Sequence, residues 1–272
     1  MFNAKRSIFL IATLIALCFL WLFSLQPEND KDWQTAYENL PEISLTGDIL
    51  TINNVRDFRY QANGEIDTAN YQRRQYNISE LTGLWFGLSH FAPLGLAHAF
   101  LSFEFKGSDF LVVSIEARLE KHHNGYNPIS GLFRQYNKTI VLASEEDVIG
   151  LRTHIRKEPV YLYPIESSPI RLRALLFQYL REIDDLHVNP TFYHSFFDNC
   201  LTGLLRASKN TNHWWQWLDY RIILPGYSDR LLFAKQQLSL ANDLQTWRQQ
   251  HLIDPDLSSI DDKHFSTAIR NP

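Results

Sequence analysis

The chain has 272 residues, and its hydrophobic share of 45% is typical of a protein with a packed core, which excludes a disordered or fibrous chain. Its net charge of −4 becomes −6 after residue 26, because Lys5 and Arg6 are then left out, and this sign disfavours nucleic-acid binding. The two cysteines, Cys18 and Cys200, are too few for a disulfide framework or a Cys/His zinc cluster.

The first predicted element is an apolar helix. Residues 7–25 carry no charge, and 19 residues is close to the roughly 20 that a helix needs to cross a bilayer. A cleaved signal peptide would have a shorter apolar run and a small-x-small site, which the following LFSLQPEND does not offer. Because Lys5 and Arg6 precede the segment and acidic residues follow it, we predict a retained anchor with a cytoplasmic N-terminus. Cys18 is interpreted as an apolar residue of this anchor.

The next elements predict a sheet. After a linker over residues 27–45, alternation of β-branched and aromatic residues over 48–60 predicts the first strand. The apolar stretch 84–105 and the stretch 110–120 flank the turn signal KGSD, which predicts a hairpin. A short connecting helix over 145–157 and a strand over 160–166 follow.

Two helices are predicted in the second half of the chain. In residues 170–186 an apolar stripe indicates an amphipathic helix; its members are Leu172, Leu175, Leu176, Tyr179, Leu180 and Ile183. Asp198 or Asn199 can serve as the N-cap of a second helix, which Cys200 would open. The pattern predicts a mixed α+β fold, with an anchor over 1–26 and one domain over 46–272 that combines an antiparallel sheet with packed helices.

Cys200 is the candidate nucleophile, because it is the single cysteine outside the predicted anchor. The partial positive charge at a helix N-terminus favours the thiolate, and the free amides there can receive an oxyanion. The alternative interpretation is an inert buried cysteine.

His98 and Glu116 are the candidate partners of that thiol. If the predicted hairpin turns about Gly107, residues whose numbers sum to 214 lie opposite each other, and His98 then faces Glu116. A carboxylate opposite an imidazole can orient it as a base. The alternatives are a core histidine and a surface carboxylate that pairs with Arg118 or Arg152.

Other chemistry finds less support in the sequence. It contains no Gly-x-Ser-x-Gly elbow, no phosphate-binding Gly-rich loop and no His-Glu-x-x-His, and we expect no metal and no cofactor. A metal site built from His122 and His123 with His154 or Asp147 is the weaker alternative to a loop. The aromatic run over 213–220 could line an acyl groove, lie at a membrane interface or belong to the core. Arg56 and Arg59 could bind lipid phosphate or form internal salt bridges.

The segments NVRDFRY, AHAFLSFEF, SIEARLE, GLFRQY, EEDVIGLRT, VYLY, FFDNC and LPGYSDRLL, with a late FSTAIR, together resemble the Lnb N-terminal periplasmic domain family. This family takes its name from a bacterial lipoprotein N-acyltransferase, and its domain is similar to permuted papain-like thiol enzymes, in which a strand His precedes a helix Cys. The resemblance implies that His98 and Cys200 are the matching dyad and that Glu116 is the third member.

The resemblance also implies a single-pass protein of the inner (cytoplasmic) membrane with a periplasmic domain. We expect a thiol acyltransferase or hydrolase that acts on a membrane lipid or lipoprotein. The named acyltransferase carries further membrane helices after this domain, so a separate membrane protein partner is an option. The alternatives are a noncatalytic lipid- or lipoprotein-binding module and a cell-wall amidase or peptidase.

Overall fold

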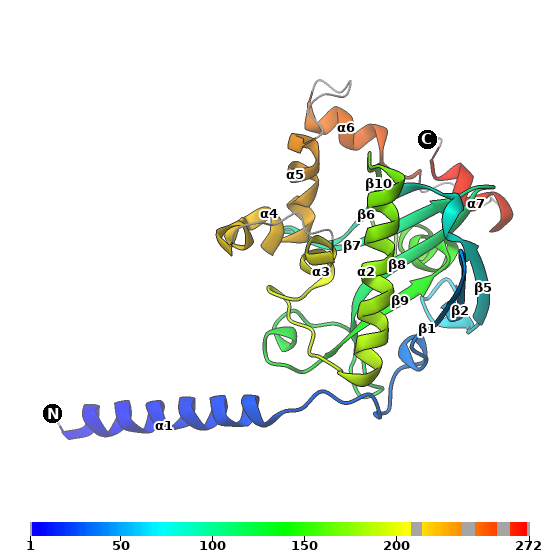
Figure 1. Cartoon of the computed structure of the whole chain (residues 1–272). Coiled ribbons are helices and arrows are strands. Elements are labelled where there is room, and N and C mark those ends of the chain that lie inside the picture. Colours follow the sequence, from blue (N-terminus) through cyan, green and yellow to red (C-terminus); the bar gives the residue numbers. More distant parts are fainter. Residues whose placement is uncertain (1, 208–213, 236–242, 255–261, 271–272) are drawn as a thin grey trace.

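The computed structural model describes residues 2–207, 214–235, 243–254 and 262–270. It is a mixed α+β structure in which an N-terminal apolar helix precedes a mostly antiparallel sheet with packed helices, as the sequence predicts (Figure 1). The strands are β1 (Glu42–Thr46), β2 (Ile49–Arg56), β3 (Arg59–Tyr60), β4 (Ile66–Thr68), β5 (Tyr71–Asn77), β6 (Leu81–Ala92), β7 (Leu96–Phe105), β8 (Asp109–Arg118), β9 (Asn137–Ala143) and β10 (Val160–Pro164).

The α-helices are α1 (Phe2–Ser24), α2 (Pro169–Val188), α3 (Cys200–Ala207), α4 (Tyr220–Ile223), α5 (Ser228–Lys235), α6 (Leu244–Gln250) and α7 (Asp262–Ala268). A π-helix, η4 (Glu146–Ile155), stands where the connecting helix is predicted. The 3-10 turns are η1 (Thr35–Tyr37), η2 (Ile78–Glu80), η3 (Ser130–Leu132), η5 (Trp214–Leu218) and η6 (Pro225–Tyr227).

The large sheet has the order β1-β2-β9-β8-β7-β6-β10, with β5 paired to β2. Alternate residues of each strand point to opposite faces, so the sheet carries two cores. One core lies under α2 and α3 and contains Ala99, Leu101 and Ile115. The other contains Phe100 and Val112 and is covered by η4 and α7. Figure 1 shows α2 crossing the first of these faces.

The hairpin of β7 and β8 has the predicted register, because Leu101 pairs with Val113 and Phe105 with Asp109. Within the described part of the chain this pairing ends at Leu101. Beyond it, β7 continues on β6 alone, and β8 continues on β9 alone. The two strands therefore diverge and leave a gap between them, and α3 packs against both strands.

Three of the differences between the structure and the predicted elements concern the start of the sheet, the hairpin and the connecting helix. The sheet begins at β1, six residues before the first predicted strand. The apolar stretch 84–105 lies in two strands, β6 and β7, because the chain turns at Leu94 and Gly95, which both have positive φ. The connecting helix is a π-helix, a form that is often found at functional sites.

Gly87 supplies a test of the packing around β7. It lies opposite Phe100, and a Cβ on Gly87 would come within 2.1 Å of the Phe100 ring, which is fully buried. We expect Gly87→Ala to lower the free energy of unfolding by about 1–3 kcal/mol, since the ring has no room to move.

Urea unfolding of the full chain measures this loss. Gly83→Ala on the same strand is the matched control, because its Cβ would meet the flexible Glu104 side chain. An equal effect of the two substitutions would contradict the packing described here.

Candidate active site

Cys200 is the first residue of α3, where the sequence predicts it. The side chain of Asn199 caps this helix: its Oδ1 accepts the amides of Leu201 at 3.0 Å and Thr202 at 2.9 Å. In return Thr202 Oγ1 accepts the amide of Asn199 at 2.8 Å. This reciprocal cap fixes the helix start and therefore the position of the thiol.

The thiol of Cys200 lies in the gap between β7 and β8. Its Sγ accepts the amide of Ala99 at 3.5 Å and is 4.0 Å from the carbonyl oxygen of Ala97. These two residues flank His98 on β7. Because strand amides point sideways within the sheet, Sγ lies at the free edge of β7. The residue is 3% exposed, so the thiol is shielded from water.

His98 reaches the same gap from the opposite face of the sheet. Its Nε2 is 2.7 Å from Ser114 Oγ on β8, and Ser114 Oγ donates to Glu116 Oε1 at 2.7 Å. His98 Nε2 lies 3.8 Å from Glu116 Oε1. The structure thus brings His98 and Glu116 together and links them through Ser114, which sequence reasoning did not select.

The hydrogen-bonded chain His98–Ser114–Glu116, which we call the relay, determines which ring nitrogen of His98 carries the proton. Ser114 has one hydroxyl proton and gives it to Glu116, so Nε2 of His98 must donate its own proton to Ser114. Nδ1 then carries the free lone pair. A neutral imidazole held in this way has its base at Nδ1.

Glu116 is the charge that the relay depends on. Burial alone would raise its pKa, but Arg56, His98 and Arg152 outweigh burial and lower the pKa to about 2. Arg56 Nη1 lies 3.9 Å from Glu116 and donates to Asp147 with its other nitrogens at 2.9 and 3.1 Å. The salt-bridge interpretation of Arg56 is confirmed. The segments NVRDFRY and EEDVIGLRT therefore meet beneath the candidate site.

The imidazole of His98 and the thiol of Cys200 both favour their neutral forms. Burial, followed by the charge of Arg152, lowers the pKa of His98 to about 3. Burial raises the pKa of the Cys200 thiol to about 11, although the amides of Ala99 and Leu201 favour the thiolate. The helix start favours the thiolate, as expected, but burial has the larger effect on the pKa of the thiol. Within the described residues, no hydrogen bond joins His98 to Cys200.

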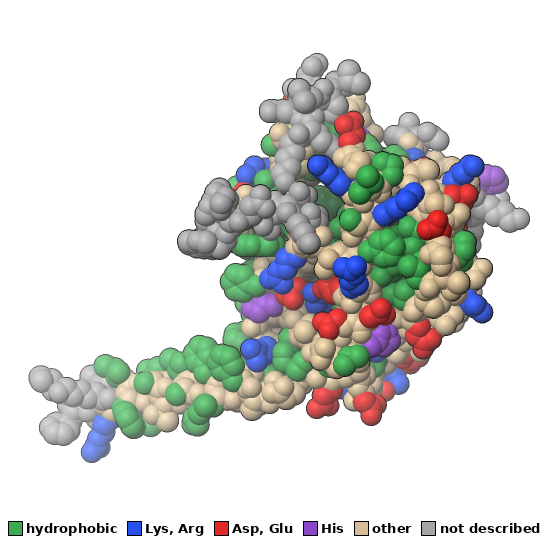
Figure 2. All heavy atoms as spheres, in the orientation of Figure 1, with side chains coloured by type: hydrophobic (Ala, Val, Ile, Leu, Met, Phe, Trp, Pro, Cys, Tyr) green, Lys and Arg blue, Asp and Glu red, His purple; other side chains and the backbone are tan. Residues whose placement is uncertain are grey.

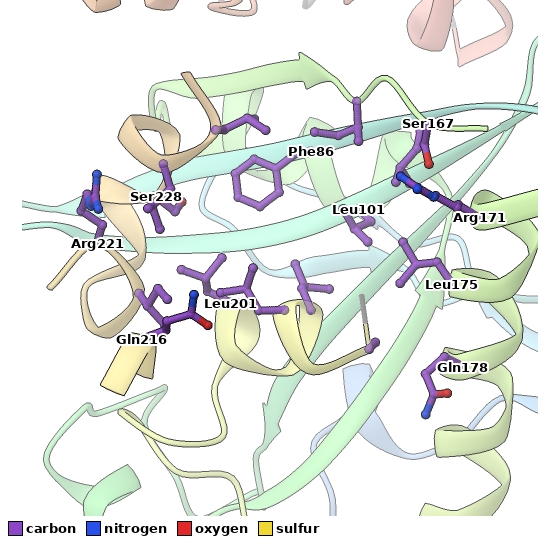
Figure 3. Close-up of a pocket in the computed structure, with 18 of the residues that line it drawn as sticks. Phe86, Leu101, Ser167, Arg171, Leu175, Gln178, Leu201, Gln216, Arg221 and Ser228 are labelled. Atoms are coloured by element: carbon purple, nitrogen blue, oxygen red, sulfur yellow. The ribbon is translucent and has the colours of Figure 1, made fainter. Parts of the chain in front are cut away.

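A large, mostly apolar cavity lies against α3, the helix that Cys200 opens. Its volume is about 1580 Å³, more than the 300–1,000 Å³ of common ligand pockets. Figure 3 shows Phe86 and Leu101 of the sheet, Leu175 of α2 and Leu201 of α3 around it. Arg171 and Arg221 contribute charge to its lining. Leu201 follows Cys200 directly, so the cavity and the thiol lie on the same face of the sheet.

The residues of the alternative metal site have other contacts. His154 packs on Phe265, Asp147 is bound by Arg56, and His123 Nδ1 accepts the amide of Glu120 at 3.0 Å. Among the described residues, no three His, Cys, Asp or Glu side chains form a group that could hold a metal. In the aromatic run, His213 lies outside the described residues, whereas residues 216 and 218–220 line the cavity.

His98 gives a pH prediction for stability. Its pKa is about 3 in the folded chain and ordinarily 6.5, so the unfolded chain binds a proton that the folded chain excludes. Stability should therefore rise with pH in this window. Between pH 6.5 and 5 we expect a loss of roughly 2 kcal/mol from this residue.

Urea unfolding of wild type and His98→Gln at a series of pH values measures the difference, and the variant should show a flatter profile. His122→Gln, at an exposed histidine, is the matched control. Parallel profiles for wild type and His98→Gln would show that His98 is not held neutral.

A comparison with known protein families identifies the family of the chain. The family model described as the Lnb N-terminal periplasmic domain matches residues 67–226, more than half of the chain, and this range contains His98, Glu116 and Cys200. The NVRDFRY and FSTAIR segments lie outside the matched range. No curated protein and no solved structure matches, so the permuted papain-like arrangement stays a prediction. The chain belongs to the Lnb N-terminal periplasmic domain family.

Proposed function

We propose that the protein is a membrane-anchored periplasmic thiol acyltransferase or hydrolase that acts on the acyl ester of a lipid or lipoprotein. The family supports a periplasmic domain, and α1 is long and apolar enough over Arg6–Ser24 to cross a membrane. In this proposal Cys200 is the nucleophile, His98 the base and Glu116 the group that orients the base through Ser114.

The proposal is carried by one observation: two separate arrangements of residues meet at the gap between β7 and β8. A capped helix start presents the Cys200 thiol to the free edge of β7, next to the backbone of His98. A charged relay on the other face holds His98 with Nε2 occupied and Nδ1 free. A structural cysteine needs neither a relay of this kind nor a buried ionised carboxylate.

The proposed reaction has two steps. Nδ1 of His98 takes the proton of Cys200 as Sγ attacks the ester carbonyl carbon, and the C–S bond forms. The amide of Cys200 at the start of α3 would receive the negative charge that develops on the carbonyl oxygen. The ester C–O bond then breaks, the alcohol leaves with the proton from His98, and a thioester remains. An amine or water attacks this thioester, gives its proton to His98, and Cys200 leaves and regains its proton from His98.

The proposal requires that His98 and Cys200 come closer together when substrate binds. The thiol and the imidazole enter the gap from opposite faces, and without substrate they are not hydrogen-bonded. Catalytic hydrogen bonds are often long before substrate binds and shorten in the complex. A substrate carbonyl in the gap would exclude water, place its carbon against Sγ and bring the thiol proton within reach of Nδ1.

The cavity favours an acyl chain over a cell-wall fragment. Its lining includes Leu84, Phe86, Leu175, Leu201 and Leu204, side chains that suit hydrocarbon. The lining also carries polar residues such as Glu166, Gln178 and Arg181, but a peptidoglycan fragment would leave its larger apolar part without a matching ligand surface. The amidase alternative is therefore not favoured.

One observation favours a second candidate, a noncatalytic lipid-binding module. The Cys200 thiol is buried and has a pKa of about 11, and it has no hydrogen bond to His98 among the described residues. A protein that only binds acyl chains would need the cavity but not a reactive thiol.

Acyl turnover tests the proposal. Full-length protein in proteoliposomes receives a phospholipid with a radiolabelled acyl chain and a diacylglyceryl-cysteine peptide as amine acceptor. We expect labelled fatty acid or N-acyl peptide from wild type, and a loss of at least about 100-fold in Cys200→Ala and His98→Ala. Cys18→Ala, at the exposed cysteine of α1, is the matched control and should keep wild-type activity.

The outcomes separate the two candidates. Equal rates in wild type and Cys200→Ala would exclude the thiol mechanism. Saturable binding of a fluorescent fatty acid without any turnover would favour the binding module.

A further inference from the structure

The end of α1 is fastened to the domain by one arginine. Arg134 Nη1 donates to the carbonyl oxygen of Leu22 at 3.4 Å. Its guanidinium lies 5.0 Å from the centre of the Phe23 ring and 5.7 Å from that of Phe192. The predicted anchor and the domain surface around Arg134 are thus in direct contact.

Arg134 belongs to a pair of loops that are bound to each other. Ser195 Oγ donates to the carbonyl oxygen of Pro128 at 2.6 Å, and the amide of Ser195 donates to Gly131 at 3.3 Å. A Cβ on Gly131 would come within 2.3 Å of Ser195 Oγ, so the approach depends on glycine. The loop after β8 and the loop before α3 therefore form one surface beside α1.

This surface exposes four large apolar side chains, which we call the loop patch: Ile129 (66% exposed), Phe133 (44%), Phe196 (41%) and Phe197 (55%). The backbone beneath Phe196 and Phe197 is held in place, because the next residue, Asp198, pairs with Lys138 at 2.9 Å. Exposed apolar clusters of this kind mark interaction sites.

We infer that the loop patch enters the surface of the bilayer that α1 crosses. Continuity with α1 identifies the occupant, since Arg134 contacts both Phe23 of the anchor and the loop that carries Phe192. Figure 1 shows α1 leaving the domain on the side where these loops lie, and Figure 2 shows hydrophobic side chains on α1 and on the adjoining edge of the domain.

The consequence concerns the position of Cys200. Phe197 precedes it by three residues, so their Cα atoms are at most about 11 Å apart. A loop patch in the headgroup layer would therefore hold the gap between β7 and β8 at the bilayer surface. This inference goes beyond the proposed function, because it holds for a binding module as well as for an enzyme.

Depth-dependent fluorescence quenching tests the inference on the full chain. Phe197→Trp and Ile129→Trp are reconstituted in phosphatidylcholine and phosphatidylglycerol vesicles, with and without a shallow dibrominated phosphatidylcholine. The emission of wild type is subtracted from that of each variant, and the difference is compared between vesicles with and without brominated lipid. We expect this added emission to lie to the blue of water-exposed Trp and to be mostly lost in brominated vesicles.

Ile170→Trp is the matched control. Ile170 is 80% exposed at the start of α2, whereas the other end of this helix binds Asn29 of the linker, about 25 Å away along the helix axis. Its added emission should not change with bromine. Native Trp21 in α1 reports insertion of the anchor. Unquenched emission from both loop-patch variants, with Trp21 quenched, would overturn the inference and leave the proposed chemistry untouched.

Discussion

The buried charge of Glu116 is the constraint on which this domain face depends. An unpaired buried carboxylate would cost about 3–5 kcal/mol, so cations must surround it. Arg56 comes from β2 and Arg152 from the π-helix, and Asp147 in turn holds Arg56. Three distant segments are thereby drawn to one point. The same carboxylate accepts the hydrogen bond of Ser114, and this bond sets the orientation and tautomer of His98.

The divergence of β7 and β8 leaves the backbone of β7 available to the thiol of Cys200. A continuous ladder would use the amide of Ala99 and the carbonyl of Ala97, and the sheet would separate the two faces completely. Because the ladder ends at Leu101, these groups are free to contact Cys200 at the start of α3. The apolar cavity lies on the face of the sheet that α3 covers, and the charged relay lies on the other face. The same α3 start follows directly from the loop patch.

Local chemistry explains what could be predicted. Gly107, with positive φ, sets the turn and hence the hairpin register, and Asn199 marks the helix start. The gap could not be predicted, since it depends on a helix about one hundred residues later in the chain. Ser114 and Glu116 are two residues apart and share one face of β8, so the sequence shows that they are neighbours. That Ser114 links His98 to Glu116 follows only from the observed distances. The raised pKa of Cys200 depends on burial, which a single sequence does not reveal.

The central claim is that Cys200 forms a covalent acyl intermediate with His98 as its base. Intact-mass spectrometry of the full chain after brief incubation with an activated long-chain acyl ester tests it most directly. The account predicts one added acyl group on Cys200, removed by neutral hydroxylamine, and none in His98→Ala. An adduct that forms equally without His98, or no adduct on Cys200 while substrate is consumed, would contradict it.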